Sequence, residues 1–207
     1  TGECSQAADY GPTRGPRGGT RVGRRTKAAV RHRPAALHEE GGVMTRTVAV
    51  ASQKGGVGKT TTVASLGVAL SDLGDEVLLV DLDPQACLTF SLGIDPEDLA
   101  LSIHDVLAGT VRAREVVTAT EDGVDLLPAT IELARTEATL LTSGRREHTL
   151  DDALAELRGH YDWILLDCPP TLGILTVNAL TAADDVIVPL QCETLAHRGV
   201  GQLLRTV

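Results

Sequence analysis

From Thr45 onward, short apolar runs alternate with stretches of helical character, and this alternation predicts an α/β fold. Several runs are apolar at consecutive positions, which is typical of strands buried on both faces. Because strands alternate with helices, we expect a mostly parallel sheet with helices on both faces. The expected strands lie at 47–51, 76–81, 123–127, 161–167 and 185–189, and the expected helices at 60–73, 103–108, 112–118, 132–142 and 149–158.

The two ends of the chain differ from this pattern. Residues 1–43 are rich in Gly, Arg, Pro and Ala without an apolar period, so we expect a disordered basic tail or an upstream segment there. Met44 is the only methionine and stands directly before the first expected strand, so residues 44–207 are interpreted as the folded domain. A helix expected from about Thr194 shows no end signal by Val207, and we therefore expect the C-terminal part of the domain to be missing.

Composition narrows the classes of function. Of the 207 residues, 43% are hydrophobic, which is enough for a sizeable core, but only 2% are aromatic. This scarcity disfavours a nucleic-acid binder that stacks bases on exposed rings. Residues 1–43 hold eight basic and four acidic residues, whereas 44–207 hold eleven basic and twenty-four acidic ones. Any contact of the domain with DNA or an anionic membrane must therefore be a local patch. No apolar run approaches the roughly 18 residues that a membrane span requires.

The cysteines point to a reducing compartment. They form no CxxC pair and show no zinc-site spacing, so we expect reduced thiols and a cytoplasmic protein. Cys87 and Cys168 are interpreted as small packing residues rather than ligands. The four cysteines are Cys4, Cys87, Cys168 and Cys192.

The segment KGGVGKTT, residues 54–61, lies between the first expected strand and the first expected helix, where a phosphate-binding loop is meaningful. Its glycines allow backbone N–H groups to surround phosphate oxygens, and the helix that follows adds its positive N-terminal end. Lys59 is expected to reach the β- and γ-phosphates, and the Thr60 hydroxyl to bind Mg²⁺. The pattern GxxxxGK[ST] fails only at its first position, Gln53. The expected nucleotide contacts are Lys54, Gly55, Gly56, Val57, Gly58, Lys59, Thr60 and Thr61.

Lysine usage supports a special role for this loop. The chain has only three lysines against sixteen arginines, and two of the three, Lys54 and Lys59, lie in the loop. A compact ammonium group on a flexible stem is therefore kept where phosphates are expected. Lys54 is not part of the ordinary phosphate-loop pattern.

Two further strands are expected to end in carboxylates at the same edge of the sheet, where ligands of such folds bind. Asp81 and Asp83 follow one strand, and Asp167 closes another. A single aspartate at a strand end is often only a helix cap or turn former. Three beside a phosphate loop favour a metal and water site, in which Asp167 holds Mg²⁺ directly or through water and Asp83 orients a water molecule.

The motifs KGGVGKTT, VDLDPQ and LLDCPP together closely resemble the ParA/Soj branch of the deviant Walker ATPases, which are relatives of MinD. The resemblance runs from about Met44 to the end of the chain. It implies a P-loop NTPase fold, the cofactors ATP and Mg²⁺, and ATP hydrolysis. It also implies that Asp83 is the catalytic aspartate with Asp81 as its support, and that Lys54 is the signature lysine.

Members of this branch form an ATP-sandwich homodimer, in which the resemblance assigns Lys54 to the partner's phosphates. The ATP-bound dimer binds DNA non-specifically, and a ParB-like centromere-binding protein stimulates hydrolysis and release. This cycle segregates plasmids or chromosomes and implies a cytoplasmic, nucleoid-associated protein. The adenine-contacting and DNA-binding residues of the branch lie beyond Val207. The branch usually has Gly-Asn or a similar small pair where this chain has Ala86 and Cys87.

Other functions remain open at this point. A MinD-like positioning ATPase at the membrane would need a C-terminal amphipathic helix, and that branch usually lacks the Pro-Gln of VDLDPQ. An iron–sulfur carrier of the same fold would need cysteines that converge on a dimer axis. A non-catalytic interaction protein is disfavoured because the chain retains Lys54, Lys59, Thr60, Asp83 and Asp167 together.

Overall fold

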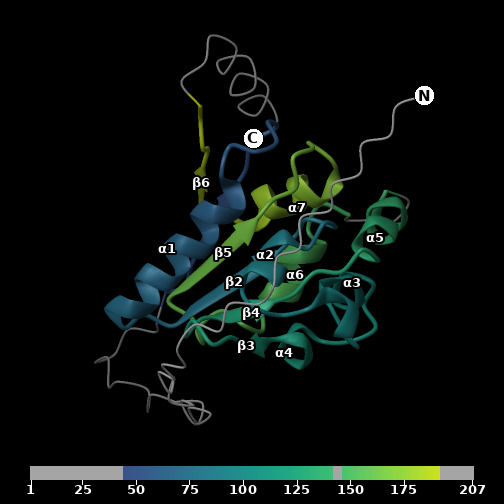
Figure 1. Cartoon of the computed structure of the whole chain (residues 1–207). Coiled ribbons are helices and arrows are strands. Elements are labelled where there is room, and N and C mark those ends of the chain that lie inside the picture. Colours follow the sequence, from purple (N-terminus) through teal and green to yellow (C-terminus); the bar gives the residue numbers. More distant parts are fainter. Residues whose placement is uncertain (1–43, 142–145, 192–207) are drawn as a thin grey trace, which may run out of the picture. The chain divides into compact units, whose positions relative to one another are not determined.

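The computed structural model describes residues 44–141 and 146–191, which form a sheet covered by helices (Figure 1). The sheet has the strand order β3-β4-β2-β5-β1-β6. All neighbouring strands pair in parallel except β3 and β4, which are antiparallel, so the expected mostly parallel sheet is confirmed. The strands are β1 (Arg46–Val50), β2 (Val77–Asp81), β3 (Thr118–Ala119), β4 (Asp125–Leu127), β5 (Trp163–Asp167) and β6 (Asp185–Ile187).

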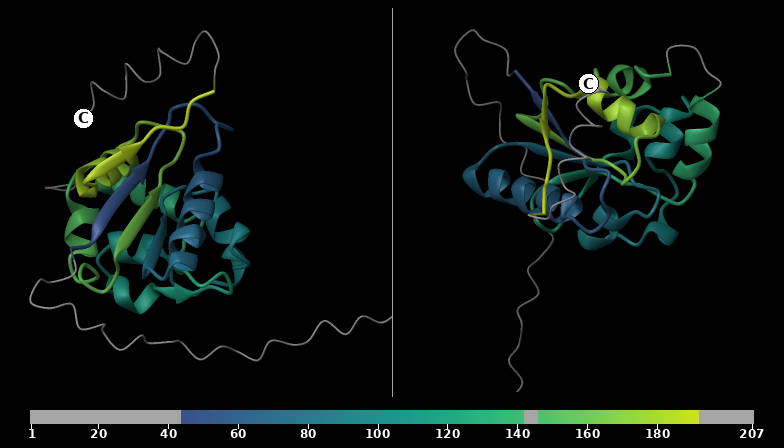
Figure 2. Two further views of the ribbon diagram at one scale, coloured as in Figure 1. Left: turned by 90° about the vertical axis from the view of Figure 1, so that its left-hand side faces the viewer. Right: turned by 90° about the horizontal axis from the view of Figure 1, so that it is seen from above.

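Helices cover both faces of the sheet, as expected. Helix α1 lies along one face, and α5, α6 and α7 lie on the other (Figure 2). Within the described ranges no helix is both long and apolar enough to cross a membrane. The helices are α1 (Lys59–Leu73), α2 (Cys87–Ser91), α3 (Ile103–Leu107), α4 (Ala113–Val116), α5 (Leu133–Leu140), α6 (Thr149–Leu154) and α7 (Ile174–Ala182), with a 3₁₀ turn at Pro96–Asp98.

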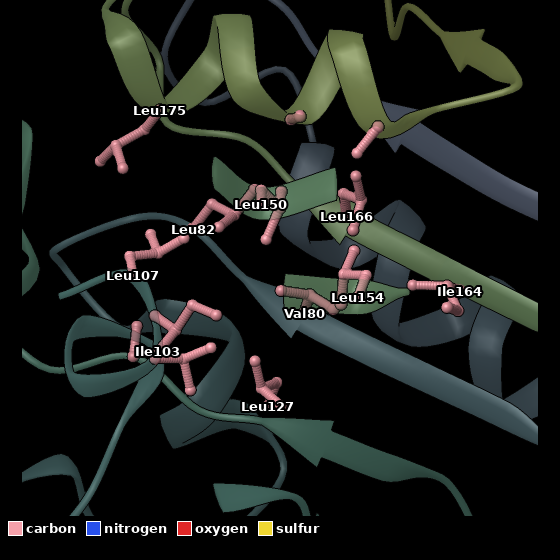
Figure 3. Packing of buried hydrophobic residues seen from close by; sticks show 14 of the residues in the cluster. Val80, Leu82, Ile103, Leu107, Leu127, Leu150, Leu154, Ile164, Leu166 and Leu175 are labelled. Carbon is pink, nitrogen blue, oxygen red and sulfur yellow. The ribbon is translucent and has the colours of Figure 1, made fainter. Parts of the chain in front are cut away.

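The alternation of side chains along the central strands produces two separate cores. Leu79 and Leu165 face α1 and α2, whereas their neighbours in the sequence face the opposite layer. Figure 3 shows that opposite layer, in which Leu154 of α6 lies close to Val80 and Leu166. Both faces of β2 and β5 are therefore buried, which explains why these strands are apolar at consecutive positions.

Some elements differ from the prediction. Helix α7 was not predicted because its sequence ILTVNALTA is apolar on nearly all sides and lacks a polar stripe. Helix α2, with five residues, is too short to show a helical period. The helix predicted for 112–118 is wrong at its end, because α4 stops at Val116 and Thr118 pairs with Leu126 in β3. The expectations for residues 1–43 and for the helix after Thr194 lie outside the described residues.

The turn after β2 contains a residue in an unusual conformation. Ala86 has φ 52° and ψ 33°, and within the described ranges it alone among non-glycine residues has a positive φ. The turn is closed by a hydrogen bond from the Ala86 N–H to the Asp83 carbonyl at 2.8 Å. A side chain in this left-handed region crowds the backbone, whereas glycine adopts it freely. The glycine that the ParA/Soj resemblance leads us to expect at this position would adopt this conformation without strain.

Replacing Ala86 by glycine should therefore stabilise the protein. Relief of left-handed strain contributes about 1 kcal/mol, and the greater freedom of glycine in the unfolded chain together with the loss of a buried methyl group offsets part of it. We expect the free energy of unfolding in urea to rise by about 0.5 kcal/mol. The control is Ala69→Gly, at an exposed position inside helix α1, which should lower stability instead. A drop for Ala86→Gly as large as that of the control would contradict the strain.

Candidate functional site

The carboxyl ends of three neighbouring strands bring the predicted site residues to one edge of the sheet. Strand β5 lies between β1 and β2, and Asp167 is in register with Val50 on one side and Asp81 on the other. The pairing continues past the strand ends, because Cys168 N–H donates to the Val50 carbonyl at 3.2 Å and Leu82 N–H donates to the Asp167 carbonyl at 3.0 Å. The phosphate loop, the Asp83 turn and Asp167 therefore start from adjacent points.

The phosphate loop spans the turn between β1 and α1. Gly56 and Gly58 have φ 72° and 90°, a region that side chains rarely adopt, so the loop requires glycine at both positions. Gly55 has no such φ, and a Cβ there would meet nothing within 4 Å. Its missing side chain therefore relieves no crowding within the chain itself and leaves room above the backbone for a ligand.

Helix α1 begins directly after this loop with Gly58 as its N-cap. Thr62 fastens the first turn, because its N–H and its hydroxyl both donate to the Gly58 carbonyl, at 2.9 and 2.7 Å. The first turn contains no acidic residue and the cap makes no side-chain hydrogen bond. The positive end of α1 is therefore not neutralised by a carboxylate of its own first turn, which favours binding of an anion. Thr60 is half-buried at this end, whereas Thr61 is exposed.

The two lysines of the loop lie in opposite environments. Lys59 is 8% exposed, and its ammonium charge lowers the pKa of Asp167. Lys54 is exposed, and its Nζ donates a hydrogen bond to Oε1 of Gln191 at 2.7 Å. Gln191 also donates from Nε2 to the Gly56 carbonyl at 3.3 Å. Sequence reasoning missed Gln191, although a polar residue shortly after the strand next to β1 was a usable signal.

Asp167 is a buried carboxylate with unmet bonding capacity. It is 1% exposed, and neither of its oxygens has a hydrogen-bond partner of good geometry among the described residues. Burial raises its pKa to about 7, while the nearby Thr60 hydroxyl and the Lys59 charge favour the ionised form. A buried carboxylate without partners is costly, and native structures keep such groups where a ligand or an ion satisfies them.

Asp81 has the same burial but a saturated environment. Its Oδ2 accepts from the Thr89 N–H at 2.9 Å and the Thr89 hydroxyl at 2.7 Å, and its Oδ1 accepts from the Asp83 N–H at 3.1 Å. Thr89 also accepts from the Ala129 N–H at 3.0 Å. Burial raises the pKa of Asp81 to about 6, with these hydrogen bonds opposing the shift. Asp81 therefore fastens α2 and the Asp83 turn, and its oxygens are already in use.

Asp83 lies past the strand in a half-buried position, with its Oδ1 accepting from the Gln85 N–H at 3.0 Å.

Cys87 lies near this turn, where burial and then the charges of the three aspartates raise the pKa of its thiol. Cys168 is fully buried and belongs to the core, as interpreted from the sequence, but Cys87 is exposed. The packing role assigned to Cys87 is therefore wrong, because α2 turns this residue outward. Cys4 and Cys192 lie outside the described residues.

The residues at this edge fit a magnesium ion that shares its ligands with phosphates. No cluster of three or more His, Cys, Asp or Glu side chains that could hold a metal occurs within 44–141 and 146–191. Magnesium in nucleotide sites needs only one or two protein oxygens, because waters and phosphate oxygens complete its octahedron. The unpartnered oxygens of Asp167 and the Thr60 hydroxyl beside them supply donors of this kind.

Comparison with known proteins gives a consistent family. The model of the AAA domain matches residues 45–207. The sporulation initiation inhibitor protein Soj of Bacillus subtilis is 46% identical over 165 residues, which cover 79% of this chain and 65% of that protein. The chromosome partitioning protein ParA of Caulobacter vibrioides is 47% identical over 165 residues, covering 78% and 62%. The chain thus spans less than two thirds of the length of these relatives.

Solved structures agree with the fold. A structure described as cobyrinic acid a,c-diamide synthase from Mycobacterium smegmatis, with bound ATP analog and magnesium, superimposes with a TM-score of 0.76 at 63% identity. The match covers 78% of this chain and 66% of that one. The P-loop NTPase fold expected from the motifs is therefore confirmed. Together, the domain match and these relatives show that the chain belongs to the AAA domain family, in its ParA/Soj group.

Proposed function

We propose that this chain is the nucleotide-binding part of an ATP-dependent dimerisation switch that hydrolyses ATP with Mg²⁺. In this proposal the ATP-bound homodimer holds non-specific DNA, and a ParB-like centromere-binding protein releases it during plasmid or chromosome partitioning. The names of the Soj and ParA relatives support this role. The proposed location is the cytoplasm, in association with the nucleoid.

The proposal of a dimerisation switch rests on one observation: the loop holds two lysines, of which one is buried and one is exposed. Lys59 is buried, and its charge acts on Asp167, which favours contact with a nucleotide bound in its own subunit. Lys54 lies on the exposed side of the same loop. An exposed ammonium five positions before the buried one lies where it can exchange its contact with Gln191 for a phosphate that another subunit presents. A single-subunit ATPase would need only Lys59.

The residues of one subunit divide the work of binding. The N–H groups of the loop and of the first turn of α1 contact phosphate oxygens, and Lys59 neutralises their charge. Thr60 and Asp167 hold Mg²⁺, which screens the negative charge that the phosphates carry. Asp81 is committed to Thr89 and the Asp83 backbone and therefore contributes position rather than a ligand atom.

In this proposal Lys54 accounts for dimerisation and Asp83 for hydrolysis. Lys54 contacts the partner's phosphates only when two subunits face each other, so bound ATP favours the dimer. Loss of the γ-phosphate on hydrolysis removes this contact. Asp83 is held on a short turn beside the loop, with one carboxylate oxygen used by the Gln85 N–H. Its charge would orient the attacking water, and hydrolysis would then release the dimer.

The partitioning role can be separated from its alternatives by one set of assays on the full-length polypeptide that contains this chain. We expect ATP-dependent retention on random-sequence DNA that is lost at high salt, because the contact is with phosphates. ATP-dependent binding to anionic liposomes instead would favour the MinD-like alternative. The similar structure described as cobyrinic acid a,c-diamide synthase suggests a third function to test, a reaction of ATP with cobyrinic acid. ATP turnover that depends on cobyrinic acid and ignores DNA would favour it over partitioning.

Lys59→Ala should weaken ATP binding by at least about tenfold, because a charge-assisted contact worth about 1.5–3 kcal/mol is lost. The measurement is titration of the full-length protein with a fluorescent ATP analogue in the presence of magnesium. Lys54→Ala is the matched control and should bind the analogue with unchanged affinity at protein concentrations too low for dimerisation, where linkage to the dimer does not contribute. Equal affinities for Lys59→Ala and the unaltered protein would contradict the contact.

Lys54→Ala should bind ATP but remain monomeric, because the contact across the dimer is lost while the contacts within one subunit persist. Light scattering with ATP and magnesium measures the mass directly. Lys54→Arg retains the charge on a bulkier group and should form the dimer only in part. An ATP-dependent dimer of Lys54→Ala would refute the assignment of Lys54 to the partner's phosphates.

Asp83→Ala should form the ATP-dependent dimer yet hydrolyse ATP at least about 100-fold more slowly, the usual size of a lost acid–base or water-orienting group. Asp83→Asn is the control for the turn, because its amide oxygen can still accept from the Gln85 N–H. Both variants should lose turnover if the carboxylate charge acts on water. Normal turnover in Asp83→Asn would instead show that Asp83 only shapes the turn.

A further inference from the structure

Gln191 joins two parts of the phosphate loop through a single side chain. Gln191 comes shortly after β6. Strand β6 pairs with β1, and the phosphate loop begins at the end of β1. The β6–β1 pairing extends to the start of the loop, because Ala51 N–H donates to the Ile187 carbonyl at 3.0 Å. Beyond this pairing, the exposed Gln191 amide accepts from Lys54 Nζ and donates to the Gly56 carbonyl. The amide therefore contacts the lysine and the loop backbone at once.

These two hydrogen bonds set a specific geometry for Lys54. Its ammonium is drawn toward the end of β6 in its own subunit, and the acceptor is itself held by the Gly56 carbonyl. Gly56 has a positive φ, so the second contact also supports the special backbone of the loop. Binding a phosphate of another subunit away from the end of β6 would draw the ammonium out of this position. The contact with Gln191 and the contact across a dimer therefore compete.

We propose that Gln191 is a positioning residue that holds Lys54 within its own subunit and thereby raises the ATP concentration or protein concentration at which the dimer forms. This inference rests on the proposed function, because it needs Lys54 to act across the dimer. Gln191 acts through Lys54 and does not itself contact the nucleotide.

The size of the effect follows from one hydrogen bond with a charged donor at an exposed position. A net contribution of about 1 kcal/mol corresponds to about fivefold in the release of one lysine. Two subunits each release one lysine in a symmetric dimer, so the effect enters twice. Removing the amide should therefore tighten the dimer by about 5- to 25-fold.

The test compares Gln191→Ala with Gln191→Glu in the full-length protein, in an Asp83→Asn background that keeps ATP from being consumed. Analytical ultracentrifugation with ATP and magnesium gives the dimer dissociation constant. Gln191→Ala should lower it, and Gln191→Glu, whose charge holds Lys54 more firmly, should raise it. Leu190→Ala is the matched control, because it alters the exposed neighbour without removing a hydrogen-bonding group and should leave the constant unchanged.

A second measurement needs no dimer and no nucleotide. The rate at which acetic anhydride acetylates Lys54 reports how firmly its ammonium is held, and the chain has only three lysines to map by mass spectrometry. The rate should rise several-fold in Gln191→Ala and fall in Gln191→Glu. Repulsion between a new carboxylate and the partner's phosphates does not alter this rate, so the two measurements separate the hold on Lys54 from charge effects in the dimer.

The outcomes distinguish this inference from the function on which it rests. A protein that dimerises with ATP, with the same dissociation constant and the same Lys54 acetylation rate in all Gln191 variants, overturns the role of Gln191 alone. A Lys54 acetylation rate that responds to Gln191 while no variant dimerises overturns the proposed dimer switch and the gating with it. Opposite shifts of the dissociation constant in the Ala and Glu variants, matched by opposite shifts of the acetylation rate, support the proposal.

Discussion

The register of three parallel strands is the constraint on which the site depends. Asp167 at the end of β5 stands opposite Val50 of β1 and Asp81 of β2, so the phosphate loop and the Asp83 turn leave the sheet on either side of Asp167. Burial of β2 and β5 on both faces maintains this register, because a one-residue slip would exchange the apolar sets that face α1 and α6. The chemistry of the edge thus depends on the packing of two cores behind it.

Asp81 and Asp167 lie side by side in this register, but they differ in the hydrogen bonds that their oxygens accept, and local contacts cause the difference. Asp81 receives three hydrogen bonds, two of them from Thr89 of the short helix α2, and so serves the shape of the turn. Asp167 receives none of good geometry and keeps its oxygens for a ligand. The left-handed conformation of Ala86 is part of the same arrangement, since it turns the chain from Asp83 into α2 and brings Thr89 under Asp81.

The strands, their parallel arrangement and the long helix α1 were predictable, because alternating apolar runs and a glycine-rich turn carry strong local signals. Helix α7 was not, since a helix buried on nearly all sides has no polar stripe to mark it. Strand β3 was not predicted, and its first residue Thr118 was assigned to the preceding helix, because two residues cannot show a period of their own. The exposure of Cys87 was also missed, as nothing in the sequence shows which way a five-residue helix faces.

The sequence by itself determined the residue types of the site: the glycines with positive φ, the two lysines, and the aspartates at strand ends. These follow from local rules, because backbone conformation and motif spacing are properties of neighbouring residues. Only the tertiary structure decided that Lys59 is buried while Lys54 is exposed. It also decided that the oxygens of Asp167, and not those of Asp81, lack hydrogen bonds of good geometry, and that Gln191 contacts the loop. Those outcomes arise from contacts between distant segments, with Lys54 and Gln191 separated by 137 positions, and only packing of the sheet brings such residues together.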